Sequence, residues 1–273
     1  MIPAGQAFYK MSGSGNDFVV IDDRAGGART SFPAELIQRI CARGTGVGAD
    51  GVVFLEASDQ AAVRLTYLNA DGSRADLCGN ATLCTTRLAV ELGLGAEGGF
   101  RIETDSGTVA ARLIGGRPEI DLQPVNAVEA AAAGIAPGHG EWRVGFALVG
   151  VPHLVVQCDN VSEIDVVTRG RSLRHHASLS HGANVNFVSQ PAGGRWRVRT
   201  YERGVEAETL ACGSGAVATA ILLSVWGEAD GAVDLETTSG RILSVRLRKD
   251  GDSWRPSLAG EARVVYQGIL SET

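Results

Sequence analysis

Short runs of β-branched and other apolar residues, separated by turn residues, recur along most of the chain, a pattern typical of β-strands. In the first half these runs are FVVID, GVVFLE, VRLTYL, FRIETD, TVAARLI and PEIDL, and in the second half they are HLVVQ, VNFVS, WRVRTYE, VDLET and ILSVRL. Most of them follow one another as hairpins or meanders, so we expect mostly antiparallel sheets. We expect the last run, residues 263–270, to return and close the first sheet.

Two longer segments, residues 80–92 and 213–225, are apolar around most of their circumference, and a glycine follows closely after each. An all-round apolar surface is typical of a buried helix, and glycine is favoured just beyond a helix C-terminus. We therefore predict one central helix in each half. Residues 33–42 predict a third, amphipathic helix. The alanine-rich segment 128–140 is interpreted as the connection between the halves.

The two halves of the chain repeat one another in sequence. Four blocks recur in the same order, most of them at an offset of 133 or 134 residues. They are TY ahead of CG (66–79 and 200–213), GAD or GAN leading into a strand (48–56 and 182–189), IETDSGTVAARL and LETTSGRILSVRL (102–113 and 235–247) and, more loosely, FVV and LVV ahead of an acidic residue (18–20 and 154–156). Such regular repetition indicates two copies of one unit.

These patterns together predict an α+β fold built from two pseudo-symmetric repeats. Each repeat is expected to be a mostly antiparallel sheet or barrel wrapped around a central buried helix. The N-terminal repeat is expected to cover residues 1–125 together with the returning strand at 263–273, and the C-terminal repeat to cover residues 126–262.

Composition and charge exclude several classes of function. The chain has 273 residues, of which 44% are apolar, and a net charge of −6, values that suit one large or two modest globular domains. No stripe of Lys and Arg stands out, so we expect no nucleic-acid partner. No apolar run approaches the roughly 20 residues of a membrane span, and the first residues lack the layout of a secretory signal. Neither feature suggests a membrane role.

The five cysteines are odd in number and have no paired spacing. This usage argues against a disulfide framework and favours a reducing cytoplasm. The five histidines form no zinc-like pattern with the cysteines, so we expect no metal site.

Cys78 and Cys212 stand at matching positions in the repeat, each at the start of a predicted buried helix. The N-terminus of a helix has free N–H groups and about half a positive charge, which lowers the pKa of a thiol there and can hold a carboxylate. Cys41, Cys84 and Cys158 have no counterpart in the repeat. A lone cysteine is most often a small buried apolar residue, but a repeated pair indicates function. We expect the two matched thiols to face one another across a shared cleft.

Two acid/base groups on opposite faces of one carbon suit the inversion of a stereocentre that bears an acidic hydrogen. One group removes the proton, and the other delivers a proton from the far side. The charge that develops on the neighbouring carboxylate would be stabilised by the two helix N-termini, so no cofactor is required. The sequence has neither a dinucleotide-binding glycine fingerprint after a strand nor a phosphate-binding loop.

Six segments, in order and over almost the whole chain, resemble the diaminopimelate epimerase family. They are KMSGSGNDFVVID, GVGADG, NADGSRADLCGN, GVPH, GANVNFV and ERGVEAETLACGSGA. The resemblance implies PLP-independent interconversion of LL- and meso-2,6-diaminopimelate by two cysteines from two similar domains. It also implies a role in lysine and peptidoglycan precursor synthesis and a homodimer.

The resemblance also assigns roles to individual residues. Cys78 and Cys212 correspond to the two acid/base thiols. The family's substrate contacts correspond to Asn16, Asn69, Asn184, Glu202 and Arg203, and to the backbone N–H groups of Gly79, Asn80, Gly213 and Ser214. His153 and Glu202 correspond to the groups that tune the thiols.

Other interpretations remain open at this point. Val151 stands where many members of the family have an asparagine that binds the distal carboxylate, so the chain could be a racemase of another amino acid. A non-catalytic small-molecule-binding or thiol-redox protein is a third possibility. The three asparagines could serve turns, His153 could be a structural histidine, and Glu202 with Arg203 could form a surface ion pair.

Overall fold

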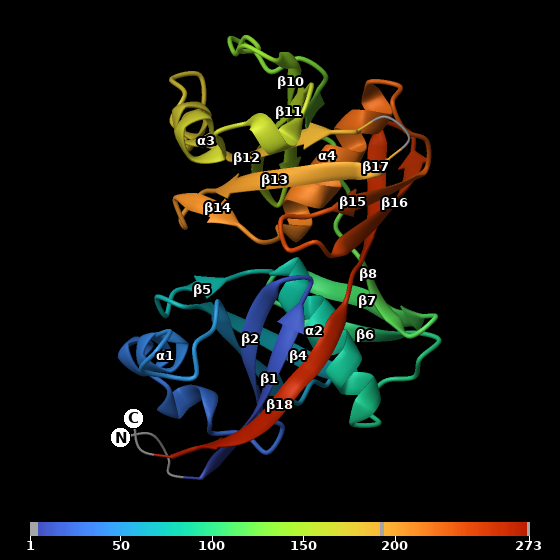
Figure 1. Ribbon diagram of the computed structural model, residues 1–273. Coiled ribbons are helices and arrows are strands. Elements are labelled where there is room, and N and C mark those ends of the chain that lie inside the picture. Colours follow the sequence, from blue (N-terminus) through green and yellow to red (C-terminus); the bar gives the residue numbers. More distant parts are fainter. Residues whose placement is uncertain (1–4, 192–193, 272–273) are drawn as a thin grey trace. The chain divides into compact units, whose positions relative to one another are not determined.

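The computed structural model describes residues 5–191 and 194–271, and the chain divides into two compact units (Figure 1). Unit 1 comprises Met1–Ile120 and Ala259–Thr273, and unit 2 comprises Asp121–Leu258. Both units are mixed, mostly antiparallel sheets with two α-helices each, so the predicted α+β class is confirmed. We describe the two units separately.

Unit 1 holds the first eleven elements of the chain and its last strand. Its elements are β1 (Gln6–Gly13), β2 (Asn16–Asp22), the 3-10 turn η1 (Arg29–Ser31), α1 (Ala34–Cys41), β3 (Gly51–Glu56), β4 (Val63–Asn69), β5 (Arg74–Ala75), α2 (Gly79–Glu91), β6 (Phe100–Thr104), β7 (Gly107–Ile114), β8 (Arg117–Asp121, whose last residue belongs to unit 2) and β18 (Ala262–Leu270). Strands β1 and β18 run antiparallel, from Gln6 opposite Leu270 to Gly13 opposite Ala262 (Figure 1).

Unit 2 follows the same order of elements. Its elements are β9 (Val128–Glu129), β10 (Glu141–Val149), β11 (Val151–Cys158), the 3-10 turn η2 (Val161–Glu163), α3 (Val166–Arg174), β12 (Asn184–Ser189), β13 (Trp196–Glu202), β14 (Ala207–Thr209), α4 (Gly213–Val225), β15 (Ala232–Glu236), β16 (Ile242–Asp250) and β17 (Ser253–Ala259, whose last residue belongs to unit 1).

Strand pairing repeats between the units along with the order of elements. In unit 1 the β1–β2 pair is antiparallel, β2–β3 parallel, β3–β4 antiparallel and β4–β6 parallel. In unit 2 the corresponding pairs β10–β11, β11–β12, β12–β13 and β13–β15 have the same directions. The edge place beside the first strand is taken by β18 in unit 1 and by β9 in unit 2. The sequence repeat is therefore a repeat of topology.

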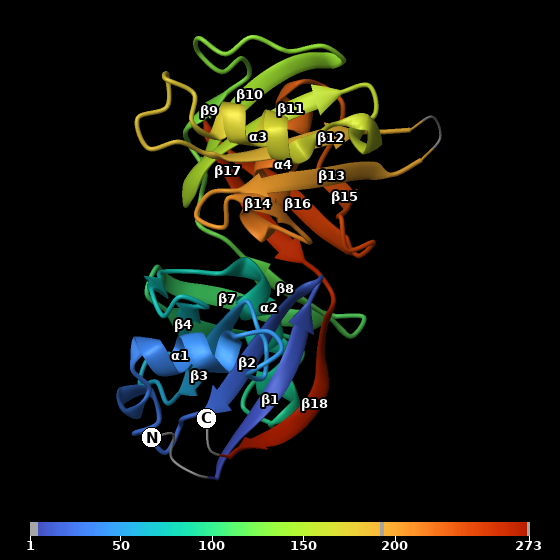
Figure 2. The same ribbon diagram turned by 60° about the vertical axis from the view of Figure 1, so that its left-hand side comes forward.

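The two central helices are buried by strands of their own unit. Helix α2 packs against β1, β4, β7 and β18, and α4 packs against β10, β11, β12 and β16. Nine residues of α2 and ten of α4 are buried, which agrees with their all-round apolar sequences. Helices α1 and α3 pack against other strands, α1 on β3 and α3 on β12 and β13 (Figure 2).

One interpretation of the sequence needs correction, and some elements were not predicted. The alanine-rich segment 128–140 is not the connection between the units but part of unit 2, where β9 pairs with β10, and Ala132 and Ile135 lie in a core cluster. Helix α3 was not predicted, because only Val166, Gly170 and Leu173 of its nine residues are buried. Strand β10 was also missed, because its central Gly145 interrupts the apolar pattern; a Cβ there would lie 2.7 Å from Leu222 of α4.

Candidate active site

Cys78 and Cys212 occupy the same place in their respective units. Each is the N-cap residue of a central helix, with extended dihedral angles of φ −125° and ψ 115° at Cys78 and φ −135° and ψ 112° at Cys212. Their carbonyl oxygens accept the first helical hydrogen bonds, from Thr82 and Ala216 respectively, both at 2.9 Å. Both residues are half-buried. Each thiol therefore lies at the positive end of a buried helix.

The turn that follows Cys212 presents an N–H group and a hydroxyl beside the sulfur. The N–H group of Gly215 donates a hydrogen bond to Cys212 Sγ at 3.4 Å, and Ser214 Oγ lies 3.6 Å from the same atom. Hydrogen bonds to sulfur and the positive helix end both favour the thiolate over the thiol. Neither helix has an acidic residue in its first turn to oppose this effect.

The three cysteines without a counterpart in the repeat lie in environments that favour the neutral thiol. Burial raises the pKa of the Cys41 thiol to about 11 and that of the Cys158 thiol to about 12. Burial also raises the pKa of Cys84 well above its ordinary value. These thiols remain protonated at neutral pH and serve as core residues, so the repeat separates two classes of cysteine.

Alkylation with iodoacetamide at pH 8 is expected to modify Cys78 and Cys212 well before Cys41, Cys84 and Cys158. The thiolate is the reactive form, and a raised pKa together with burial suppresses it at the last three sites. Peptide mass spectrometry at increasing reaction times measures the order. Modification of Cys84 or Cys158 at the same rate as Cys78 in the folded protein would contradict the assignment.

In unit 1, Asn16 contacts Asn80 in the first turn of α2. The Asn80 side chain, two positions after Cys78, donates a hydrogen bond from Nδ2 to Asn16 Oδ1. Asn16 in turn donates from Nδ2 to Asp50 Oδ2 at 3.0 Å. Two residues that the resemblance assigns to substrate binding are thus joined, and the position of Asn16 depends on Asp50.

Asp50, the partner of Asn16, belongs to a charged cluster with Arg43, Asp17 and Lys10. Arg43 donates from Nη2 to Asp50 Oδ1 at 2.7 Å and to Asp17 Oδ1 at 2.6 Å. Lys10, which is buried, donates to Asp17 Oδ2 at 2.6 Å and to the carbonyl of Gly48. Burial would raise the pKa of Asp17, but hydrogen bonds from Arg43 and Lys10 outweigh it and hold that pKa below its ordinary value.

Asn69 has a local partner in the structure. It ends β4, and its Nδ2 donates to Ser73 Oγ at 3.0 Å, while its backbone N–H donates to the carbonyl of Ser73 at 2.8 Å. Its side chain therefore closes the turn before β5. Its neighbour Ala70 donates to the carbonyl of Asp50 at 3.1 Å, which joins this turn to the segment that bonds Asn16.

In unit 2, His153 and Asn184 lie opposite one another on the parallel strands β11 and β12. Asn184 Oδ1 accepts a hydrogen bond from the backbone N–H of Arg203 at 2.8 Å, and Asn184 Nδ2 lies 3.5 Å from His153 Nε2. His153 is fully buried, and this burial, with the positive charge of Arg203, lowers its pKa to about 3. The structure thus brings together three of the predicted residues.

Glu202 ends β13, and Arg203 begins the loop that follows. Glu202 is opposite Ala207 in the β13–β14 pair, and Arg203 donates from Nη1 to the carbonyl of His181 at 3.4 Å. Glu206, with a left-handed φ of 57°, ties this loop to α3. Its Oε1 accepts from Gly204 N at 3.0 Å and from Arg174 Nε at 3.1 Å. Val151, where the family commonly has asparagine, begins β11.

Sequence reasoning missed Asp50, Arg43 and Asn186. The repeat offered a signal for Asp50, because GAD matches the GAN that contains Asn184. Asn186 is the second asparagine of the NVN segment, and its side chain is 3.2 Å from His153 Nδ1. Nothing in the sequence distinguishes it from a surface strand residue.

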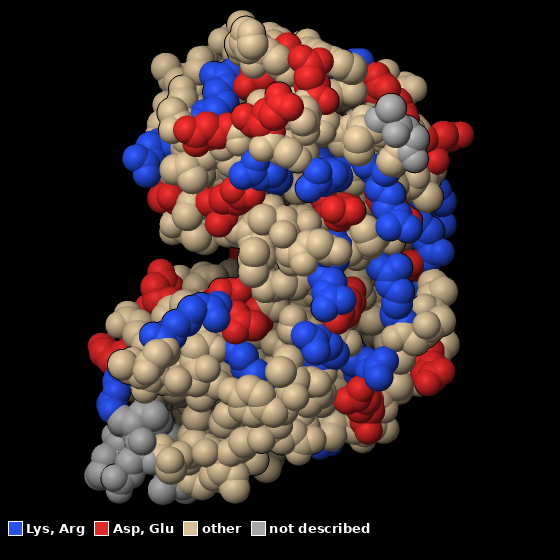
Figure 3. Space-filling model, viewed as in Figure 1, with Lys and Arg blue, Asp and Glu red and all other residues tan. Residues whose placement is uncertain are grey.

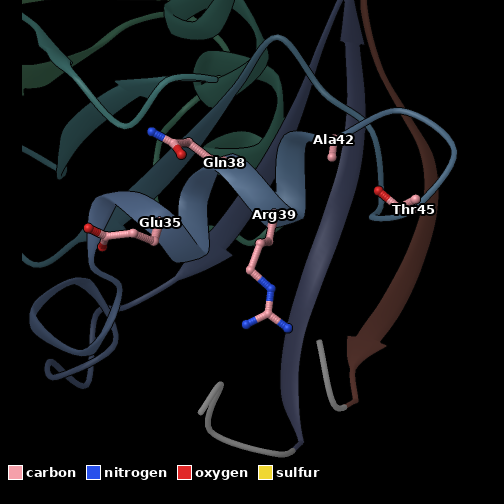
Figure 4. A pocket seen from close by; sticks show the side chains of 5 residues that line it. All are labelled: Glu35, Gln38, Arg39, Ala42 and Thr45. Carbon is pink, nitrogen blue, oxygen red and sulfur yellow. The ribbon is translucent and has the colours of Figure 1, made fainter.

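The described surface also has features away from these residues. The hollow in Figure 4 lies along α1 and is lined by Glu35, Gln38, Arg39, Ala42 and Thr45. The face in Figure 3 shows basic and acidic side chains interspersed over each unit. Among the described residues, no group of three His, Cys, Asp or Glu side chains could hold a metal ion. No helix within residues 5–191 and 194–271 is long and apolar enough to cross a membrane.

Comparison with known sequences gives a consistent result. The family model described as diaminopimelate epimerase matches residues 8–121 and 145–265. The diaminopimelate epimerase of Gemmatimonas aurantiaca is 48% identical over 276 residues, which cover 97% of this chain and 99% of the relative. That of Aquifex aeolicus is 37% identical, with 97% and 98% covered.

Comparison with solved structures shows the same fold at low sequence identity. A phenazine biosynthesis protein of the PhzF family from Bacillus anthracis superposes with a TM-score of 0.74 at 17% identity, covering 98% of this chain and 99% of its own. A hydroxyproline epimerase from Agrobacterium vitis, with bound trans-4-hydroxy-L-proline, superposes with a TM-score of 0.69 at 18% identity, covering 99% and 94%.

Proposed function

This chain belongs to the diaminopimelate epimerase family, and we propose that it is an isomerase that interconverts LL- and meso-2,6-diaminopimelate without a cofactor. Cys78 and Cys212 are the two acid/base groups of this proposal. The observation that carries it is the equivalent placement of two half-buried thiols, each the N-cap of a buried helix in its own unit.

The reaction consists of two proton transfers at one α-carbon. The thiolate of one cysteine takes the α-proton, and the electron pair of the broken C–H bond is left on the carbon and its carboxylate. The thiol of the other cysteine then delivers its proton to the opposite face, so the configuration inverts and the two sulfurs exchange protonation states. This chemistry requires both sulfurs to reach the same carbon.

The helix N-termini make the carbanion accessible. An α-proton of an amino acid is weakly acidic, and removing it places negative charge on the carboxylate. N–H groups of Gly79 and Asn80 at α2, and of Gly213 and Ser214 at α4, would hold that carboxylate. Fixed donors aimed at developing charge are the largest source of stabilisation in many enzymes. They replace the electron sink that a cofactor would otherwise supply.

The remaining candidate residues are proposed to bind the substrate or tune the thiols. Asn16 and Asn184 have fixed positions and polar atoms that suit ammonium or carboxylate groups. Arg203 offers a fork of donors for a carboxylate, and Asn69 and Glu202 are the last residues of β4 and β13. His153 and Glu202 are the proposed tuning residues, as the resemblance implies.

The proposal extends to location, pathway and assembly. Five free cysteines are consistent with a reducing cytoplasm, and the product serves lysine and peptidoglycan precursor synthesis. We infer a homodimer, supported by Val265, Tyr266 and Ile269, which are exposed on β18. Sedimentation of an Ile269→Asp variant tests the dimer, and an unchanged mass would contradict the use of this strand.

An assay in deuterium oxide tests the proposed reaction. LL-diaminopimelate incubated with the protein alone is expected to give the meso isomer with solvent deuterium at the inverted carbon. The delivered proton comes from a thiol equilibrated with solvent, so deuterium enters the product early, before the recovered substrate is labelled. Absence of both inversion and exchange with pure protein would refute the proposal. Chiral chromatography and mass spectrometry measure the two quantities.

A further inference from the structure

Asn186 is a fully buried polar residue that the proposed reaction does not use directly. It lies on β12, and its side chain has three partners in unit 2. Nδ2 donates to the carbonyl of Leu154 at 2.9 Å and lies 3.2 Å from His153 Nδ1, and Oδ1 accepts from Thr200 Oγ1 at 2.9 Å. Both polar atoms of the Asn186 amide thus have neighbouring hydrogen-bond partners.

The orientation of the Asn186 amide follows from its partners. A backbone carbonyl only accepts hydrogen bonds, so the atom next to the Leu154 carbonyl must be the NH2 group. One of its two hydrogens bonds Leu154, and the second is directed at His153 Nδ1. His153 Nδ1 must then be the acceptor and bear no proton. A neutral imidazole has one N–H group, so that group is at Nε2.

Asn184 does not accept a hydrogen bond from the Nε2–H group of His153. Asn184 Oδ1 accepts from the backbone N–H of Arg203, which only donates, so the Asn184 atom nearest His153 is an NH2 group. Two donors at 3.5 Å do not form a hydrogen bond. The Nε2–H group therefore remains available on the side of Asn184 and Arg203, both proposed substrate contacts.

Close packing joins Asn186 to the turn of Cys212. A Cβ at Gly215 would lie 2.2 Å from Asn186 Oδ1 and 3.2 Å from Cys212 Sγ. Glycine at this position thus allows the Asn186 amide to lie against the first turn of α4, beside the thiol. The His153 ring, the Asn186 amide and the Cys212 turn form one contiguous group within unit 2.

We propose that Asn186 is a positioning residue that holds His153 in its Nε2–H form, so that His153 acts in the reaction as a hydrogen-bond donor and not as a base. The expected effect on rate rests on the proposed function, but the protonated nitrogen can be observed without it. A buried imidazole next to the positive Arg203 also has no tendency to take a second proton at neutral pH. Asn186 thereby sets which partner His153 can serve: an acceptor such as a thiolate or a carboxylate.

Nitrogen NMR of protein labelled with 15N-histidine tests the inference directly. The wild-type His153 is expected to show an unprotonated Nδ1 and a protonated Nε2. In Asn186→Asp the carboxylate oxygen that replaces Nδ2 can only accept a hydrogen bond, which favours a proton on Nδ1, so the ring changes tautomer or becomes doubly protonated. We expect kcat for diaminopimelate to fall at least about tenfold, with KM changed by less than about threefold because the substrate contacts remain.

Gln157→Glu is the matched control. Gln157 is also a buried amide on β11, and it lies four positions beyond His153, so its change to an acid likewise buries a carboxyl group but about 13 Å along the strand from His153. It is expected to leave the His153 nitrogen signals and kcat near those of the wild type. A proton on Nδ1 in the wild type, or unchanged nitrogen signals in Asn186→Asp, would overturn the inference. An inactive wild-type protein with the expected signals would contradict only the proposed function.

Discussion

Replacing either Cys78 or Cys212 by alanine is expected to lower kcat/KM for diaminopimelate by about 10³-fold, while the fold and its melting temperature stay close to those of the wild type. An acid or base positioned at the reacting atom contributes about 10² to 10⁴ in rate. Epimerisation needs both groups, so loss of either one blocks inversion. Both residues are half-buried N-caps. Cys78 makes no side-chain capping bond and Cys212 would lose the 3.4 Å bond from Gly215 N–H, so we expect a structural cost of at most about 1 kcal/mol.

Cys41→Ala is the control, because it removes a thiol that is not a proposed acid/base group. Cys41 is buried on α1, and burial raises its pKa to about 11. This variant is expected to lose some stability, as removal of a buried side-chain atom does, but to keep the wild-type kcat. Initial rates in both reaction directions, with circular dichroism as the check of folding, measure the comparison. Most of the activity remaining in Cys78→Ala or Cys212→Ala would exclude that residue as a base.

The sequence best predicted those elements whose apolar positions match their buried positions. Strand β13 and helix α4 have the predicted bounds, 196–202 and 213–225, because an apolar helix or strand in a core shows its environment in every residue. Helix α3 was missed because its position is fixed by packing against β13 and not by its own sequence pattern. A Cβ at Gly170 would lie 2.4 Å from Tyr201, so this glycine is required by close packing on β13, which the local sequence does not record.

The candidate site shows the same division between local and tertiary information. The helix N-termini at Cys78 and Cys212 were predictable, because a glycine-rich turn before an apolar helix is a local pattern repeated in both halves. The long-range pairings that orient the other candidates were not predictable. Asp50 lies 34 positions from Asn16, and Asn186 lies 33 positions from His153. Which long-range partner a polar residue selects depends on strand order, and that order emerges only from the fold.

Replacing Asp17 by alanine is expected to lower the free energy of unfolding by about 3 kcal/mol, because it leaves Lys10 as a buried cation without its carboxylate. The exposed fractions of the two side chains are 9% for Lys10 and 20% for Asp17, and the Nζ–Oδ2 distance is 2.6 Å. Urea denaturation at pH 7 measures the loss. Asp22→Ala, which breaks the more exposed pair with Arg24, is the control and is expected to cost at most about 1 kcal/mol.

The double variant Lys10→Met with Asp17→Ala is expected to recover most of that loss, because no unpaired charge remains buried.

The contribution of Asp17 to stability depends on pH with a definite sign. The pKa of Asp17 in the folded protein lies below its ordinary value of 3.8, so its contribution to stability is complete above that pH and disappears as pH falls below it. The difference between wild type and Asp17→Ala should therefore shrink in acid. A difference that stays constant to pH 2, or equal costs for Asp17→Ala and Asp22→Ala, would show that the Lys10–Asp17 pair does not support the segment that positions Asn16.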